Sequence, residues 1–282
     1  MNREVTITGM EVKTHVGSNL LISAAELTGT TKNDEDDFIK DETQTVKAIL
    51  EPVSTVDGKK FFYTLDARAD GSKDKATSVV AYTEYPRAAE SGESTTGYAD
   101  TFSKDYKLNS TQANDLISGE TGAKPYVDYV FQLKATNEES DPKDIIITQM
   151  DLTYTGQTDT NKAFRAAVFA EEYNGTAFTN DAGTLKAIYA PANAVNFEAG
   201  KAVKTATTLD TVTYGSSSIA TVGAGAIKYY KVVVRLYIEG EDTTCYTDLF
   251  KTLTDKWNLD LTLELDDGST AVTNLNLLTT AP

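Results

Sequence analysis

The chain has 282 residues, and its 42 acidic residues outnumber its 26 lysines and arginines, which gives a formal net charge of -16. This balance argues against binding to nucleic acid or to an anionic membrane surface, because both need clustered cations. Hydrophobic residues make up 40% of the chain, which is enough for a large core and too much for a disordered protein. One cysteine excludes an internal disulfide, and with one histidine no zinc site is expected.

Apolar and β-branched residues alternate in short segments that turn-forming residues separate, a pattern typical of an antiparallel β-sandwich. We predict strands at residues 3–8, 43–50, 60–65, 126–134, 144–154, 163–170, 184–189, 227–238, 258–265 and 270–277. The clearest is 227–238, where Val232, Val234, Leu236 and Ile238 recur at every second position. Two segments, 110–118 and 243–256, show weak helical spacing.

Polar stretches rich in Gly, Ser and Asp interrupt the strands, and turn-forming residues of this kind cannot fill a core. They lie at 28–37, 66–78, 86–100, 135–143 and 174–183. None is long enough to be an interdomain linker. The sequence therefore predicts an all-β fold, with one antiparallel β-sandwich domain over residues 1–282, elaborated loops and one or two short helices.

No stretch approaches the roughly 18 apolar residues of a membrane span, so membrane insertion is not expected. The opening residues Met1 to Glu4 lead directly into strand-like sequence, without the charged and apolar regions of a signal peptide. Two origins stay open. The protein is either made for use inside a cell or a virion, or it is secreted and Met1 has replaced a removed leader.

Carboxylates cluster at two places, which are Asp34, Asp36 and Asp37 in a polar loop and Glu239, Glu241 and Asp242 after the strand at 227–238. Carboxylate oxygens are ligands for Ca²⁺, but neither cluster has the spacing of a calcium-binding loop. A solvated loop and a tight turn are the favoured interpretations, and Ca²⁺ is retained as a secondary hypothesis at both clusters.

The sequence does not single out any catalytic constellation. A Ser-His-Asp or Cys-His unit would have to use His15, which no Gly-x-Ser-x-Gly motif accompanies, and one histidine cannot supply His-Glu-x-x-His. His15 is expected on the surface or at a strand edge, and Cys245 is expected as a small buried hydrophobic residue. We predict no catalytic residue and do not expect an enzyme.

Three parts of the chain carry a resemblance to a known family. They are residues 50–58 (Leu-Glu-Pro-Val-Ser-Thr-Val-Asp-Gly) with 61–64, residues 232–242 with Cys245, and the opening residues 5–22 with Gly9-Met10 and 19–22 (Asn-Leu-Leu-Ile). These segments resemble the secreted surface proteins of Gram-positive bacteria that are exported with a SipW-type signal peptide, the group that contains TasA and camelysin.

This resemblance implies a jelly-roll-like β-sandwich that is exported through the Sec route to the cell surface or biofilm matrix, and TasA-like members assemble into fibres. Camelysin-like members carry a metallopeptidase label. The present chain lacks His-Glu-x-x-His, so no catalytic residue is carried over, and its missing leader is a further departure from the group.

Three functions remain as hypotheses. The first is a structural subunit of an extracellular fibre, which binds copies of itself. The second is a carbohydrate- or ligand-binding sandwich, in which Tyr82, Tyr85, Tyr98 and Tyr106 form a stacking platform. The third is a virion structural protein, since capsid and tail proteins carry no leader and often use jelly rolls.

In the fibre hypothesis, residues 2–12 act as a donor strand. Val5 and Ile7 alternate with threonines before Gly9, and a terminal strand of this kind can pair with its own sheet or with that of a neighbour. The residues predicted to carry self-assembly are Val5, Ile7, Met10 and Val12. Head-to-tail exchange would give an open homopolymer, whereas the alternative is a strand added to the chain's own sandwich.

Overall fold

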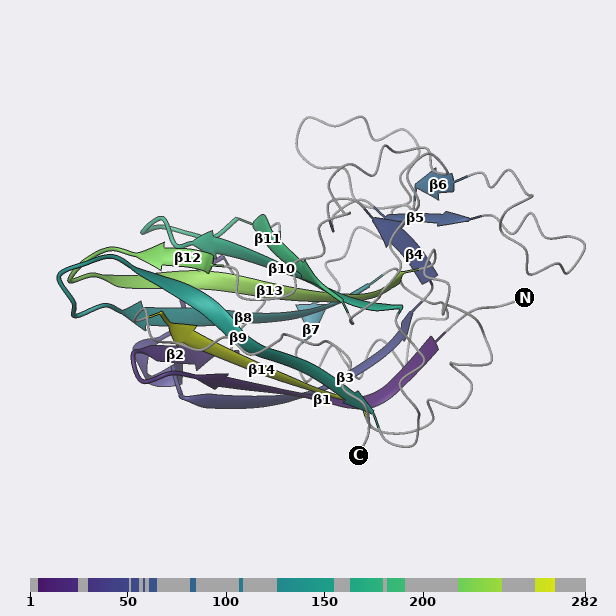
Figure 1. Cartoon of the computed structure of the whole chain (residues 1–282), viewed down its shortest axis with the longest axis horizontal. Coiled ribbons are helices and arrows are strands. Elements are labelled where there is room, and N and C mark those ends of the chain that lie inside the picture. The colour runs from purple at the N-terminus through teal and green to yellow at the C-terminus, as the bar shows by residue number, and fades with distance from the viewer. Residues whose placement is uncertain are drawn as a thin grey trace, which may run out of the picture.

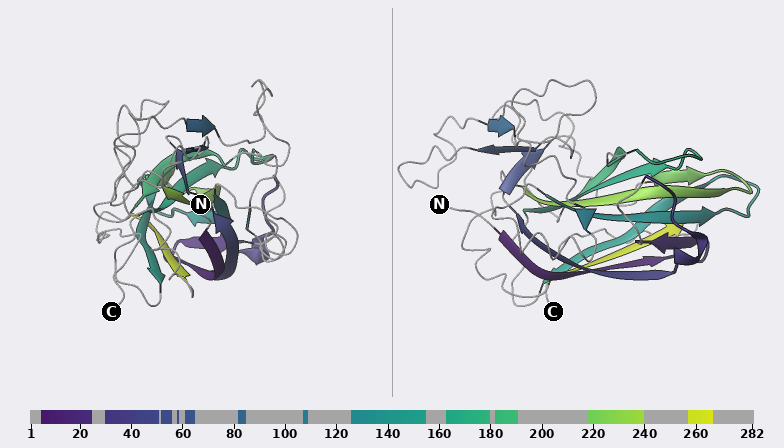
Figure 2. Two further views of the ribbon diagram at one scale, coloured as in Figure 1. Left: turned by 90° about the vertical axis from the view of Figure 1, so that its right-hand side faces the viewer. Right: turned by 180° about the vertical axis from the view of Figure 1, so that it is seen from behind.

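The computed structural model describes residues 5–24, 30–50, 52–55, 58, 61–64, 82–84, 107–108, 126–154, 163–179, 182–190, 218–239 and 257–266. These residues form two β-sheets that pack face to face, as Figures 1 and 2 show. The predicted all-β sandwich is confirmed. Within these ranges the only helical element is a short 3-10 turn, η1 (Glu35–Asp37). The segments 110–118, 243–256 and 270–277 lie outside the described residues.

The first sheet has five strands in the order β12-β9-β14-β1-β3. In chain order they are β1 (Val5–Val16), β3 (Asp41–Leu50), β9 (Lys143–Tyr154), β12 (Ser218–Val222) and β14 (Trp257–Leu265). β1 runs parallel to β14, and the other neighbours are antiparallel. The amino-terminal strand is therefore longer than the predicted 3–8 and lies inside the sheet, between β14 and β3.

The second sheet is built around β13 (Ile227–Glu239), which pairs antiparallel with β10 on one side and with β8 on the other. Its other strands are β2 (Leu20–Ser23), β4 (Pro52–Thr55), β5 (Phe61–Thr64), β6 (Tyr82–Glu84), β7 (Lys107–Leu108), β8 (Val127–Thr136), β10 (Phe164–Glu172) and β11 (Thr184–Tyr189). β4 pairs parallel with the last residues of β13, and β4, β5 and β6 lie at one end of the sandwich (Figure 1).

The main core lies between the sheets, where Val234 and Leu236 of β13 and Leu259 and Leu261 of β14 are fully buried. The opposite face of the second sheet is also buried, since Val130, Phe169 and Val233 belong to a second hydrophobic cluster. Burial on both faces explains why apolar residues such as Val233 and Tyr237 also occupy positions of β13 that face away from the main core. No helix in the described ranges is long and apolar enough to cross a membrane.

Candidate functional site

The predicted donor strand is the first candidate site. β1 pairs antiparallel with β3 along its length, and the register shifts between Thr8 and Met10, so Gly9 is the extra residue of a β-bulge. A bulge changes which residues share a face of the strand. The register therefore aligns the four positions predicted for self-assembly on one face, and these are Val5, Ile7, Met10 and Val12.

The two halves of β1 are held differently. Residues 11–16 pair with β14 on one side, and residues 11–15 also pair with β3 on the other. Among the described strands, residues 5–10 pair with β3 alone. Val12 is fully buried in the main core, and the neighbouring Thr14 hydroxyl lies 2.9 Å from the hydroxyl of Tyr129 across the core. β1 thus has an anchored half and a half with one-sided pairing, and exchange of this strand between subunits stays a prediction.

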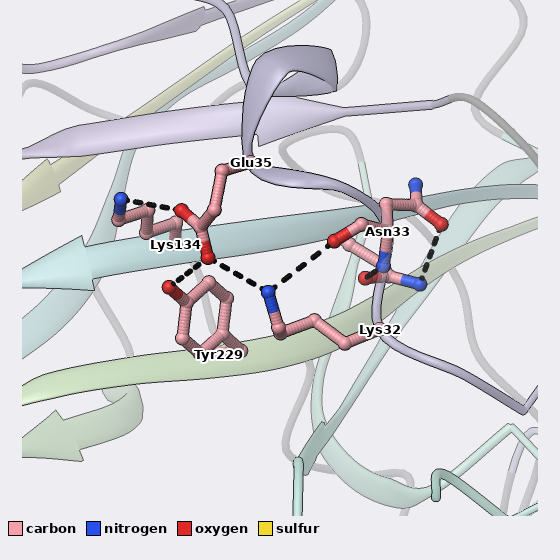
Figure 3. Close-up of polar contacts among 6 residues, drawn as sticks. Lys32, Asn33, Glu35, Lys134 and Tyr229 are labelled. Carbon is pink, nitrogen blue, oxygen red and sulfur yellow. Dashed lines mark hydrogen bonds and ion pairs between the residues drawn. The ribbon is translucent and has the colours of Figure 1, made fainter.

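A second candidate site surrounds Glu35, on η1. Its carboxylate accepts hydrogen bonds from Lys134 Nζ at 2.7 Å, from Lys32 Nζ at 2.7 Å and from the Tyr229 hydroxyl at 2.5 Å (Figure 3). Lys32 Nζ also lies 4.4 Å from the centroid of the Tyr229 ring. Lys134 belongs to β8 and Tyr229 to β13, and both are half-buried, so Glu35 binds residues 30–39 to the second sheet.

These contacts change the acidity of two groups. The hydrogen bonds from Lys134, Lys32 and Tyr229 lower the pKa of Glu35 to about 2. Burial, followed by the hydrogen bond to Glu35, raises the pKa of Tyr229 to about 12. At neutral pH the site therefore holds one carboxylate between two ammonium groups and a neutral phenol.

Asn33 anchors the same segment more deeply. Its backbone N–H donates to Gln132 Oε1 at 2.8 Å, and its side-chain amide donates to the Ser23 hydroxyl at 2.9 Å. Gln132 Nε2 donates in return to Asn33 Oδ1 at 3.1 Å. Buried side chains with satisfied hydrogen bonds define one position for a loop, so residues 30–39 are part of the framework of the sandwich.

The predicted Ca²⁺ ligands can now be placed. Asp34, Asp36 and Asp37 are all exposed around η1, while Glu35 between them is engaged by lysines. Glu239 is the last residue of β13 and is 1% exposed, and Glu241 and Asp242 lie outside the described residues. In the part of the chain that the structure describes, no three His, Cys, Asp or Glu side chains are grouped to hold a metal. Ca²⁺ binding stays a prediction.

The remaining candidates from the sequence are also placed. His15 belongs to β1, which is a central strand of the first sheet, and its side chain is exposed to solvent. Its Nδ1 lies 2.8 Å from Asp41 Oδ1 of β3. Tyr82 begins β6, whereas Tyr85, Tyr98 and Tyr106 of the stacking hypothesis lie outside the described residues, as does Cys245.

Sequence reasoning missed one buried ion pair. Arg235 of β13 donates from Nε and Nη2 to the two carboxylate oxygens of Asp128 on β8, each at 2.7 Å. Arg235 Nη1 also donates to the carbonyl oxygen of Gly58 at 2.8 Å, and the guanidinium lies 3.8 Å from the centroid of the Tyr126 ring. The alternation of β13 predicts that Arg235 points away from the core between the sheets. The sequence does not show that this other face of β13 is also buried, under the second hydrophobic cluster.

Comparison with protein-family models, curated proteins and solved structures found no match to this chain.

Proposed function

We propose that this protein is a structural subunit of an extracellular fibre or cell-surface filament, which polymerises with copies of itself by exchange of the amino-terminal donor strand. The observation that carries the proposal is the uneven pairing of β1, in which residues 5–10 have a described partner on one side only. Transfer of a strand half that is paired on one side breaks fewer hydrogen bonds than transfer of a strand that is paired on both sides. The family resemblance supports secretion and assembly.

In the proposed fibre, the first part of β1 leaves its own β3 and pairs in the same register with β3 of the next subunit. The bulge at Gly9 divides this part from the anchored half. Val12 then remains in its own core, because it is fully buried and pairs with both neighbours. The contact is head to tail and does not close on itself, so an open filament results.

Deletion of residues 2–8 tests this proposal, since it stops short of the bulge and of Val12. We expect a folded monomer with a normal β circular dichroism spectrum and no filaments by negative-stain electron microscopy, and an added peptide of residues 2–8 should bind the vacated part of β3. Filaments that form normally from the truncated chain would contradict the proposal.

A matched pair of substitutions separates an effect on the exchanged face of β1 from a general effect of added charge. Ile7 and Thr6 are neighbours on opposite faces of β1, and the register aligns Ile7 with the predicted assembly positions. Ile7→Asp should abolish filaments, because a charge would enter the exchanged face. Thr6→Asp adds the same charge and should leave assembly close to normal.

A further inference from the structure

β3 pairs with β1 along one of its two edges. β3 is an edge strand, because within the described strands it pairs with β1 alone. An edge strand presents unpaired N–H and C=O groups to another chain, and proteins usually protect such edges with proline, bulges or charged side chains, of which β3 has Asp41, Glu42 and Lys47. β3 contains no proline, and the bulge of this pair lies on β1, so the free edge of β3 is regular over Asp41–Leu50.

The two faces of β3 follow from its partners. Glu42 and Gln44 lie opposite Thr14 and Val12, both buried in the core, and Leu50 at the far end is also fully buried. Glu42, Gln44 and Leu50 therefore face the core, and Asp41 and Thr43 face outward. In an antiparallel pair, directly opposite residues share a face. When two copies of β3 pair, even positions must thus meet even positions.

Only one such two-fold register within β3 places opposite charges opposite each other. It is centred on Gln44, so that Asp41 meets position 47, a lysine, and the two-fold axis repeats this pair. Thr43 meets position 45, also a threonine, and Glu42 meets position 46, a valine. Opposite charges and threonine pairs at these distances are favourable, and the Glu42 charge is the one unfavourable feature.

Gln44 gives an independent reason for this register. Its Oε1 atom is buried and has no hydrogen-bond partner in the single chain. A buried acceptor without a donor is costly. At the two-fold axis each Gln44 lies directly opposite the Gln44 of the other copy, and a side-chain amide carries both a donor and an acceptor. Because its own chain shields this atom from solvent, the Gln44 side chain has to rotate toward the edge of β3 before the second copy can supply the missing N–H.

We propose that β3 is a homodimer contact, at which two copies pair antiparallel, edge to edge, in the register centred on Gln44. The contact is isologous and closes on itself. It is lateral to the head-to-tail contact of the proposed fibre and does not rest on it, since it uses the edge of β3 that faces away from β1.

Cysteine crosslinking tests the register on the full chain with Cys245→Ser. Hydrogen-bonded and non-hydrogen-bonded pairs alternate along an antiparallel ladder, so either the 44/44 pair or the 43/45 pair has the close Cβ spacing that a disulfide needs. We expect disulfide dimers from Gln44→Cys alone, or from Thr43→Cys mixed with Thr45→Cys. Thr43→Cys alone should not crosslink. Equal crosslinking at every position, or none at any, would overturn the proposal.

Charge exchange tests the same contact without cysteines, by sedimentation at about 0.15 M salt. Asp41→Lys should weaken dimerisation about tenfold, because it places lysines opposite each other, and the double variant Asp41→Lys with Lys47→Asp should restore it. The double variant still lacks the His15–Asp41 pair, so restoration cannot come from that contact. Glu42→Gln should tighten the dimer. Failure of the double variant to recover would refute the register.

Discussion

Glu35 shows how one surface carboxylate can hold a loop. With its pKa lowered to about 2 by hydrogen bonds from Lys134, Lys32 and Tyr229, Glu35 stabilises the fold above its ordinary pKa of 4.5, and this contribution disappears as the pH falls toward 2. Its side chain is 50% exposed, so solvent screening keeps the contribution small.

We therefore expect Glu35→Gln to lower the free energy of unfolding by about 0.5 kcal/mol at pH 7, measured by urea titration. The difference from the native protein should shrink between pH 4.5 and 2. Asp36→Asn removes one charge from the same turn and serves as the control, with a smaller expected effect. A difference for Glu35→Gln that is constant down to pH 2 would contradict this account.

Arg235 and Asp128 differ from Glu35 because their side chains are only 7% and 4% exposed. Removing one partner leaves the other charge buried, so Asp128→Leu should cost about 3–5 kcal/mol in thermal or urea unfolding. The double variant Asp128→Leu with Arg235→Met should cost less than the single one, because it leaves no buried charge. Glu172→Leu, which breaks the exposed ion pair with Lys228, is the control and should cost less than about 1 kcal/mol.

At the scale of elements, sequence pattern located the long strands and missed most of the short ones, although β5 (Phe61–Thr64), with three consecutive aromatic residues, was predicted at 60–65. β13 was predicted at 227–238 and spans Ile227–Glu239, because its apolar residues alternate over many positions. β2 (Leu20–Ser23) and β12 (Ser218–Val222) were not predicted, since four or five residues contain too little alternation to distinguish a strand from a loop. Their place depends on pairing with β8 and β9, which lie far away in the sequence.

The candidate site was predicted less well than the fold, for a related reason. Alternation of Val5 and Ile7 identified a strand at 3–8, but it did not extend through the bulge at Gly9, where the period of two is interrupted. The acids at 34–37 were recognised as a cluster, whereas the engagement of Glu35 depends on Lys134 and Tyr229 from distant strands. Such long-range pairing leaves no local signal.

Gly58 lies between β4 and β5 in the chain, and it packs closely against β10. Its φ is +67°, and a Cβ atom at this position would lie 2.8 Å from Phe169 Cζ and 3.2 Å from Ala167 Cβ. Gly58→Ala should therefore destabilise the protein by about 1–3 kcal/mol in thermal unfolding. Gly175→Ala is the matched control, since Gly175 has a φ of +90° with nothing within 4 Å. Equal losses would show that the close contact is unimportant.

At the scale of the whole molecule, net charge opposes every contact between copies. Each chain carries a formal charge of -16, so repulsion grows with each subunit added. Salt screens this repulsion, and protonation reduces it as the pH falls toward the pI of about 4.5. We expect filament or dimer formation, followed by light scattering, to increase with NaCl and with acidification, and assembly that weakens under both changes would show that attraction between charges dominates.

Calcium provides the sharpest test at this scale. If Asp34, Asp36 and Asp37, which are exposed around η1, bind Ca²⁺ or bridge subunits through it, CaCl₂ should raise the melting temperature and promote assembly more than NaCl of equal ionic strength, because coordination adds to screening. The double variant Asp36→Asn with Asp37→Asn should remove this excess and keep the response to NaCl. Identical curves for the native protein in CaCl₂ and NaCl would eliminate Ca²⁺ as a ligand and leave screening alone as the effect of salt.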